Sequence, residues 1–296
     1  MIESFLHKIM HDRNNREISK NIVITMLIKG GAMLISILTV PAYVRYFDND
    51  TAYGAWLTIA AVFSWINMFD LGIGNGLRNY LVKSIAEKDN KASKSFVSSA
   101  YVSIGLISIV FLIVGLVGAS FLNWNAILNV PDSIVSENVF RKFVQIVFAG
   151  IVIHFFFLLI NSIFYAIQRT FWPNFLSLIT QMIILLYITI PNNGTLEQKM
   201  EGLSFAYVVA YNLPLVLATL VLFLGKLNNI KPSIKCFEKT IAKKILSLGG
   251  GFFVIQIALI ALNSSNEVYI NSFFKAKDVV QYNYLSLIHI YQRKIF

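Results

Sequence analysis

Long apolar segments separated by short polar ones dominate the chain. Each apolar segment is close to the roughly 20 residues that a helix needs to cross a bilayer. Polar or turn-forming residues bound them, such as Asp-Asn-Asp at 48–50 and Pro-Asn-Asn-Gly at 191–194. The apolar runs are continuous and lack the inside–outside alternation of barrel strands. The pattern predicts an all-α, polytopic transmembrane helix bundle with spans at 22–44, 53–70, 96–121, 143–167, 172–190, 203–224 and 245–270.

The polar segments between the spans divide the chain further. Residues 1–21 are charged and polar, and the apolar run after them exceeds the h-region of about 7–15 residues in a cleavable signal peptide, so the first span is expected to remain as an anchor. Residues 22–224 then hold six helices, and 225–244 form a basic connector. Residues 245–296 hold a seventh span and a stub whose apolar patch, 285–290, is too short to cross a bilayer alone, so the number of complete spans is odd. We therefore expect a C-terminally truncated chain.

Composition excludes several classes of protein. Charged residues make up 14% of the chain and hydrophobic residues 56%, whereas a soluble domain has about 25% charged residues. So few charges cannot cover a soluble surface, which excludes an ordinary soluble enzyme, a disordered chain and a nucleic-acid module. The single cysteine, Cys236, excludes an intrachain disulfide and a cysteine-based metal cluster.

The basic residues are distributed unequally between alternate loops. If the N-terminus is cytoplasmic, 18 of the 25 Lys and Arg residues lie in inner segments, six lie in outer segments, and Lys29 lies inside the first span. Cytoplasmic loops carry an excess of Lys and Arg. The distribution predicts a cytoplasmic N-terminus, with Arg141 and Lys142 as the main exceptions.

Polar residues fall on one face of three spans, at seven-residue spacing in the first and fourth spans and at spacings of seven and four residues in the seventh. The three sets are Lys29, Ser36 and Tyr43 in the first span; His154, Asn161 and Gln168 in the fourth; and Gln256, Asn263, Glu267 and Asn271 in the seventh. Polar faces on several helices predict the walls of a hydrophilic cavity. The alternative is that these groups simply bond neighbouring helices. His154 fits either a packed, hydrogen-bonded histidine or a proton relay, and Glu267 fits either interfacial solvation or an ion-coupling role.

Lys29 and the end of the second span supply candidate headgroup contacts. Lys29 lies about 10 Å inside the first span, counted at 1.5 Å per residue. It could pair with an anionic headgroup such as a phosphate, or snorkel to the interface. Asp70 and Arg78 flank a glycine-rich helix exit, where they could pair with each other or meet a substrate headgroup. Beyond it, Leu77, Leu81, Ser84 and Ile85 predict an amphipathic helix lying at the interface.

The residues around the second span resemble a known family. The run Tyr46-Phe47 through Tyr53-Gly54-Ala55-Trp56, followed by Phe69 to Arg78 (FDLGIGNGLR), looks like the polysaccharide biosynthesis and O-antigen flippases of the multidrug/oligosaccharidyl-lipid/polysaccharide exporter superfamily. The resemblance covers the whole chain in span order and loop charge. It implies two six-helix lobes around a central cavity, of which this chain would hold the first lobe and the start of the second.

The resemblance also implies an activity and a location. A member of this family would move a polyprenyl-pyrophosphate-linked oligosaccharide from the cytoplasmic to the outer leaflet of a bacterial cytoplasmic membrane, by alternating access. Its partners would be this substrate, the membrane lipids and neighbouring polysaccharide polymerases or glycosyltransferases. A cation gradient is the usual driving force in the superfamily. No cofactor and no metal are implied.

Two alternatives differ in what they require of the sequence. A drug/cation antiporter of the same superfamily would need an acid deep in the bundle, but Asp70 and Glu267 both lie near helix ends. An integral-membrane polymerase or glycosyltransferase could use the Asp-x-Asp spacing at 48–50, yet Asp50 or Thr51 is a natural N-cap there. No HExxH, P-loop or GxSxG pattern is present. The sequence therefore favours a flippase over an enzyme.

Overall fold

The computed structural model describes residues 13–68, 72–263, 266–275, 277–283 and 285, with side chains for all of these except 13–22, 61–68, 253 and 259–263. Within this part of the chain the only regular elements are helices, which confirms the all-α prediction. They are α2 (Arg13–Phe47), α3 (Asp50–Met68), α4 (Ile73–Ala86), α5 (Asn90–Phe121), α6 (Trp124–Ile127), α7 (Glu137–Ala166), α8 (Phe171–Thr189), α9 (Leu196–Leu224), the 3-10 turns η1 (Asn228–Ile230) and η2 (Ile234–Cys236), α10 (Lys239–Asn263) and α11 (Asn266–Phe273).

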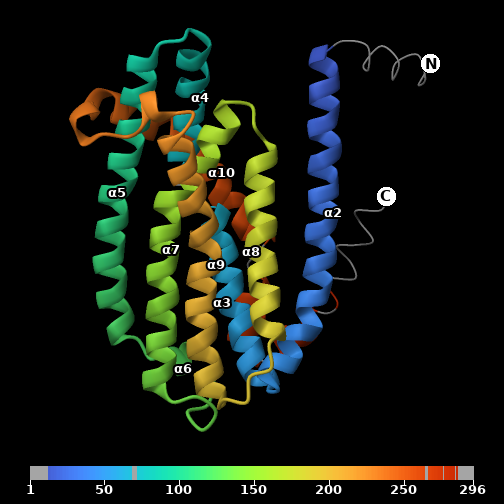
Figure 1. Cartoon of the computed structure of the whole chain (residues 1–296). Coiled ribbons are helices and arrows are strands. Elements are labelled where there is room, and N and C mark those ends of the chain that lie inside the picture. The colour runs from blue at the N-terminus through green and yellow to red at the C-terminus, as the bar shows by residue number, and fades with distance from the viewer. Residues whose placement is uncertain (1–12, 69–71, 264–265, 276, 284, 286–296) are drawn as a thin grey trace.

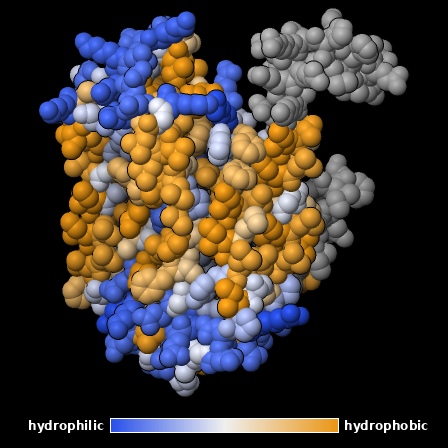
Figure 2. Space-filling view, in the orientation of Figure 1, coloured by the Kyte–Doolittle hydropathy of each residue, from blue (hydrophilic) through white to orange (hydrophobic). Residues whose placement is uncertain are grey.

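The long helices form an elongated bundle with an apolar belt. Figure 2 shows hydrophobic side chains around the middle of the bundle and hydrophilic ones at both ends. Six helical segments in the described part are long and apolar enough to cross a membrane: Val23–Phe47, Asn90–Phe121, Glu137–Ala166, Phe171–Thr189, Leu196–Leu224 and Lys239–Ala258. They overlap six of the predicted spans, and α3 coincides with the remaining one. The predicted 245–270 span comprises two helices, α10 and α11.

Side-chain caps set where several helices begin. The Asp89 side chain accepts a hydrogen bond from Ala92 N at the start of α5. Thr195 and Gln198 form a capping box at the start of α9. At α3 the prediction was wrong: Asn49, rather than Asp50 or Thr51, accepts the hydrogen bond from Ala52 N. Each cap satisfies a backbone N–H that has no partner within its helix.

The centre of the bundle is the pair α7 and α9, with α5 beyond α7 and α8 beside α9 (Figure 1). Gly150 lets these two helices approach closely, because a Cβ there would overlap the Val208 side chain of α9. Small residues permit such packing where no hydrophobic effect drives helices together. At the edge of the bundle α2 packs mainly on α8, and little of its apolar length is buried.

Helix α4 corrects one of the predictions. Leu77, Leu81 and Ser84 are buried, and the helix packs against α5, α7 and α10 instead of lying at a membrane interface. Its amphipathic pattern thus serves a protein core, with a Lys83–Glu87 ion pair of 4.0 Å on the outer side.

The backbones of α4 and α10 approach each other closely, without intervening side chains, at two glycines. Gly72 has a φ of +69°, and a Cβ there would overlap the carbonyl of Gly249. A Cβ on Gly76 would overlap the carbonyl of Ile245. This contact joins the predicted seventh helix to the first six.

The segment between α9 and α10 is held against the end of α5 by two serines. Ser98 Oγ accepts a hydrogen bond from Ser233 N, and Ser99 Oγ accepts one from Glu238 N, each at 3.0 Å. The basic connector between α9 and α10 is therefore an ordered segment that crosses that end of the bundle.

Candidate functional site

A polar cavity of about 250 Å³ lies between α7, α8 and α9. We call it the histidine cavity. His154 and Asn161 line it from α7, and Tyr211 lines it from α9. The polar residues from α8 are one helical turn apart or adjacent, namely Ser177, Thr180 and Gln181. Such a concentration of polar side chains is unusual inside a membrane bundle, where each carries a desolvation cost.

A second cavity of about 400 Å³ adjoins the first and is bordered by α2, α3, α8 and α9. We call it the aromatic cavity. Its polar residues include Ser36 and Thr39 from α2, and its rings include Tyr43, Tyr53, Trp56, Tyr207 and Tyr211. Gln181 and Tyr211 line both cavities. These two side chains therefore stand where the cavities meet.

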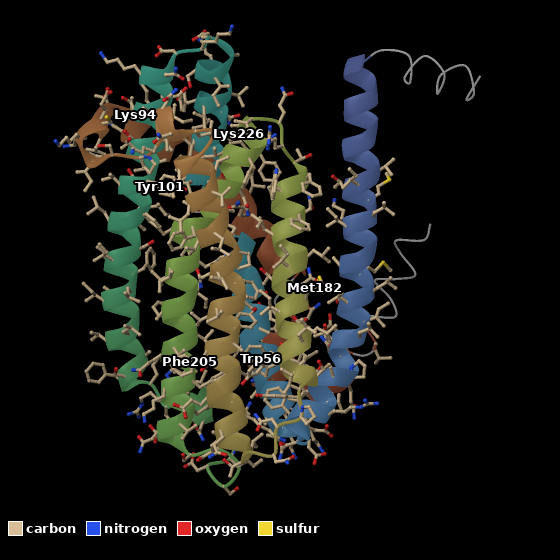
Figure 3. All side chains as sticks on the ribbon, in the orientation of Figure 1. Trp56, Lys94, Tyr101, Met182, Phe205 and Lys226 are labelled. Carbon is tan, nitrogen blue, oxygen red and sulfur yellow. The ribbon has the colours of Figure 1, made fainter. Side chains whose placement is uncertain are left out.

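The rings of the aromatic cavity form one connected wall. Tyr43 lies 5.9 Å from both Tyr53 and Trp56, measured between ring centroids. Trp56 meets Tyr207 edge-on at 5.1 Å, and Tyr207 stacks on Tyr211 at 4.3 Å. Trp56 is 1% exposed and lies among the helices, whereas Phe205 is 54% exposed at the outer surface (Figure 3). Rings packed in this way present fixed apolar faces, with hydroxyl groups at their edges for hydrogen bonding.

His154 is held by one defined contact. Its Nδ1 lies 3.2 Å from the backbone carbonyl of Tyr211, and its ring meets the Tyr211 ring edge-on at 5.5 Å. The tautomer that makes this bond carries its proton on Nδ1 and donates it to the carbonyl. The geometry matches the interpretation of His154 as a packed, hydrogen-bonded side chain.

The Oδ1 of Asn161 is buried without a hydrogen-bond partner in the described part of the chain. A buried acceptor without a partner is costly. Since this side chain lines the histidine cavity, a ligand hydroxyl entering there would supply the missing donor. Among the residues whose side chains the structure describes, those lining the two cavities include no Asp, Glu, Lys or Arg. The site is therefore suited to a neutral ligand rich in hydroxyl or amide groups.

The structure brings some of the predicted site residues together and leaves others apart. Ser36, His154 and Asn161 line the paired cavities. Lys29 is exposed on α2, and Arg78 is exposed on α4 with its guanidinium 5.2 Å from the centroid of the Tyr165 ring. Neither of these two cations lines either cavity.

The remaining predicted residues lie on other elements or outside the described part. Gln256 is half-buried on α10, and Glu267 is half-buried on α11, which packs against α3. Asp70 and the side chain of Asn263 lie outside the described residues. Gln168 does not continue the α7 face, because α7 ends at Ala166 and Gln168 has a φ of +58° in the following turn.

Several cavity residues escaped the sequence analysis as site candidates, among them Ser177 and Gln181 on α8 and Tyr207 and Tyr211 on α9. Each pair is spaced by four residues, which places both members on one helix face. The spacing identifies a face, but not whether that face borders a cavity. No group of three or more His, Cys, Asp or Glu residues that could hold a metal ion occurs among the described residues.

These features define a polytopic helical membrane protein with a neutral polar site inside the bundle. The family model described as polysaccharide biosynthesis protein matches residues 18–289, so the chain belongs to that family. The predicted resemblance is thereby confirmed. A search of curated proteins gave no match.

The fold is similar to one solved transporter. That structure is described as the inward-facing conformation of a multidrug resistance MATE family transporter of the MOP superfamily. The two share a TM-score of 0.63 and 15% sequence identity over 84% of this chain and 56% of the transporter. The chain thus spans little more than half the length of the transporter, and the likeness concerns the fold.

Proposed function

We propose that the chain belongs to a flippase that moves a polyprenyl-pyrophosphate-linked oligosaccharide from the cytoplasmic to the outer leaflet of a bacterial cytoplasmic membrane. The observation that carries this proposal is the pair of joined neutral cavities, one polar and one aromatic, within an apolar bundle. Membership of the polysaccharide biosynthesis family and a transporter fold support it.

The sugar is one part of the substrate that cannot cross the hydrocarbon core unaided. Its hydroxyl groups lose their hydrogen bonds to water when they enter hydrocarbon, at a cost of several kcal/mol for each unsatisfied polar group. The prenyl tail is apolar and can remain in the bilayer. Side chains such as Asn161 and Gln181 can replace lost water contacts. The Tyr211 ring, which is half-buried and lines both cavities, can contact the apolar C–H face of a sugar ring. Alternating closure of two lobes would then expose the cavity to each side in turn.

The charged pyrophosphate needs a different environment from the sugar. Lys29 and Arg78 stay candidates for it, and both are exposed outside the neutral cavities. In this proposal the pyrophosphate contacts cations outside the neutral cavities, while the sugars enter the cavities. Glu267 stays a candidate for coupling to a cation gradient.

The antiporter alternative is less well supported. Binding a cationic drug or an ion deep in a bundle calls for an acid there. No acid lines either cavity among the residues with described side chains. A membrane polymerase or glycosyltransferase would instead form glycosidic bonds from activated donors, which a purified sample would reveal directly.

A pair of neighbouring residues on α8 provides the test. Gln181 lines both cavities, and its Nε2 lies 3.5 Å from Ser177 Oγ; Met182 is 45% exposed on the outer surface. Gln181→Leu should lower surface polysaccharide output in a flippase-deficient host about tenfold, which corresponds to about 1.4 kcal/mol of lost transition-state stabilisation. Met182→Leu is the matched control and should leave output unchanged.

Protein amount in the membrane must be measured alongside output, because a variant that fails to fold would also lower it. Equal output from Gln181→Leu and the wild type, at equal protein amounts, would remove the cavities from the mechanism.

A further inference from the structure

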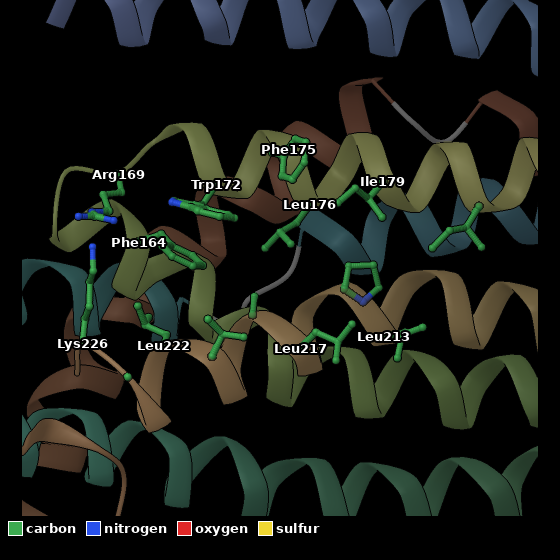
Figure 4. Close-up of a pocket in the computed structure, with 15 residues that line it drawn as sticks. Phe164, Arg169, Trp172, Phe175, Leu176, Ile179, Leu213, Leu217, Leu222 and Lys226 are labelled. Carbon is green, nitrogen blue, oxygen red and sulfur yellow. The ribbon is translucent and has the colours of Figure 1, made fainter. Parts of the chain in front are cut away.

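A separate groove of about 540 Å³ runs along the outside of the bundle between α8 and α9. Its walls are apolar, with Phe164, Trp172 and Leu176 on one side and Leu213, Leu217 and Leu222 on the other (Figure 4). Leu213 and Leu217 are 44% and 52% exposed, so the groove opens toward the surface that would face lipid. Leu176 also lines the histidine cavity and separates it from the groove.

Two cations close one end of this groove. Arg169 lies in the turn between α7 and α8, and Lys226 follows the end of α9. Figure 4 shows their charged groups side by side, beyond the last apolar side chains. The ion pairs found among the described residues are Lys83–Glu87 and Arg141–Glu137, so neither cation is neutralised by an acid in this part of the chain. Both remain free to meet an anion.

The rings beside the cations are packed into a fixed surface. Phe164 stacks on Trp172 at 5.8 Å between centroids, and Trp172 meets Phe175 edge-on at 6.0 Å. Tryptophan is enriched at the level of lipid headgroups. The ring of Trp172 thus marks the boundary between the cationic end of the groove and its apolar part.

The length of the groove selects among anionic lipids. From Arg169 to Ile183 along α8 is 14 residues, or about 20 Å at 1.5 Å per residue. This distance fits a headgroup plus one leaflet of a hydrocarbon core of about 30 Å. An acyl chain matches the length of this groove, whereas a long polyprenyl chain would extend well beyond it.

We propose that the α8–α9 groove binds an anionic membrane phospholipid, with its phosphate between Arg169 and Lys226 and an acyl chain along the apolar walls. This site is distinct from the two cavities and does not depend on what they transport. If the N-terminus is cytoplasmic, the lipid belongs to the inner leaflet, where anionic headgroups attract basic residues.

Native mass spectrometry of the purified chain in detergent tests the proposal. The probes are phosphatidylglycerol and phosphatidylcholine with identical acyl chains. The wild type should retain phosphatidylglycerol more strongly than phosphatidylcholine. Arg169→Ala with Lys226→Ala should weaken phosphatidylglycerol binding about 30-fold, since each basic residue near an anionic surface contributes about fivefold, and should leave phosphatidylcholine unaffected. The matched control, Lys231→Ala with Lys235→Ala, removes the same charge from the connector and should change neither.

A second pair of variants tests whether a lipid chain occupies the apolar part of the groove. Leu217→Trp should fill the groove and reduce retention of both lipids, whereas Leu220→Trp, on an exposed part of α9 outside the groove, should not. Size-exclusion profiles like that of the wild type establish that the variants fold.

Three results would overturn the proposal: no preference for phosphatidylglycerol, an equal loss in the connector control, or unchanged retention by Leu217→Trp. Displacement of phosphatidylglycerol by a lower concentration of a long-chain polyprenyl phosphate would overturn the assignment to a phospholipid. Lipid retention is measured without transport, so loss of flippase activity alone would leave this inference standing.

Discussion

Two asparagines on neighbouring helices illustrate how one type of side chain acts in two ways within the bundle. Asn212 on α9 is buried, and its Nδ2 donates hydrogen bonds to the carbonyls of Gly150 at 3.0 Å and Val208 at 2.9 Å. The Oδ1 atoms of both asparagines are buried without a partner in the described part of the chain, but only Asn161, on α7, lines the histidine cavity. The first holds helices together, and the second offers an acceptor to a ligand.

Substitution by leucine, which has a similar size, should separate these two effects. Asn212→Leu should destabilise the bundle by roughly 0.6 kcal/mol, the average for a hydrogen bond between membrane helices, because its bond to Gly150 joins α9 to α7 whereas its bond to Val208 lies within α9. Asn161→Leu should leave the melting temperature in detergent almost unchanged and lower polysaccharide output. The opposite pattern, with Asn161→Leu the less stable variant and fully active, would show that Asn161 is structural.

The sequence predicted some of the individual residues of the site. Ser36, His154 and Asn161 were found because seven-residue spacing identifies one face of a helix. Gln181 and Tyr211 were missed, because the rotation of α8 and α9 in the bundle decides which of their faces borders a cavity. Lys29 shares the face of Ser36 but lies two turns further along α2, away from the cavity wall.

Among the helices, hydropathy located the elements well and their ends poorly. Helix α5 begins at Asn90 and α9 at Leu196, six and seven residues before the predicted spans. Hydropathy marks where a chain enters hydrocarbon, whereas a cap such as Asp89 or Thr195 marks where helical hydrogen bonding starts. Helix α4 was misplaced for a related reason: an apolar stripe looks the same whether it faces lipid or protein.

The glycines between α4 and α10 lead to a prediction about element packing. Gly76→Ala should lower stability by about 1–3 kcal/mol, the usual cost of overpacking, because the new Cβ overlaps the Ile245 carbonyl. Gly250→Ala is the matched control in a helix, with no atom within 4 Å of its Cβ. It should be neutral or stabilising by up to about 1 kcal/mol, the helix preference for alanine over glycine.

Thermal unfolding of both variants in one detergent gives the comparison. Similar melting temperatures for the two would mean that α4 and α10 do not pack through these glycines.

For the whole molecule, hydropathy predicted an all-helical bundle because membrane insertion leaves few other ways to satisfy backbone polar groups. It could not predict which helices touch. The contact of α10 with α4 and α5, and that of α2 with α8, depend on glycines and side-chain shapes far apart in the sequence. The division into lobes stays a prediction, although the α4–α10 contact is where a seventh helix would join the first six.

The two ends of the bundle carry different charges. One end has the α4–α5 turn, the α7–α8 turn and the connector, with Lys83, Lys88, Lys91, Lys94, Arg169, Lys226, Lys231, Lys235, Lys239, Lys243 and Lys244. The other end has the loops after α2, α5 and α8, with Arg45, Arg141, Lys142 and Lys199. Of the outer exceptions, Arg141 forms an ion pair with Glu137, which offsets its charge. The positive-inside rule therefore predicts that the connector end faces the cytoplasm.

The single cysteine makes this orientation measurable without a fusion protein. Cys236 is partly exposed in η2, on the connector that Ser98 and Ser99 hold at the basic end. A membrane-impermeant maleimide should leave Cys236 unlabelled in intact spheroplasts and label it after permeabilisation. In Cys236→Ser with Asn193→Cys, the new thiol lies in the exposed α8–α9 loop at the opposite end and should react before permeabilisation. Because helices cannot reverse in the bilayer, labelling of Cys236 in intact spheroplasts would invert the whole bundle, and with it the direction of transport proposed above.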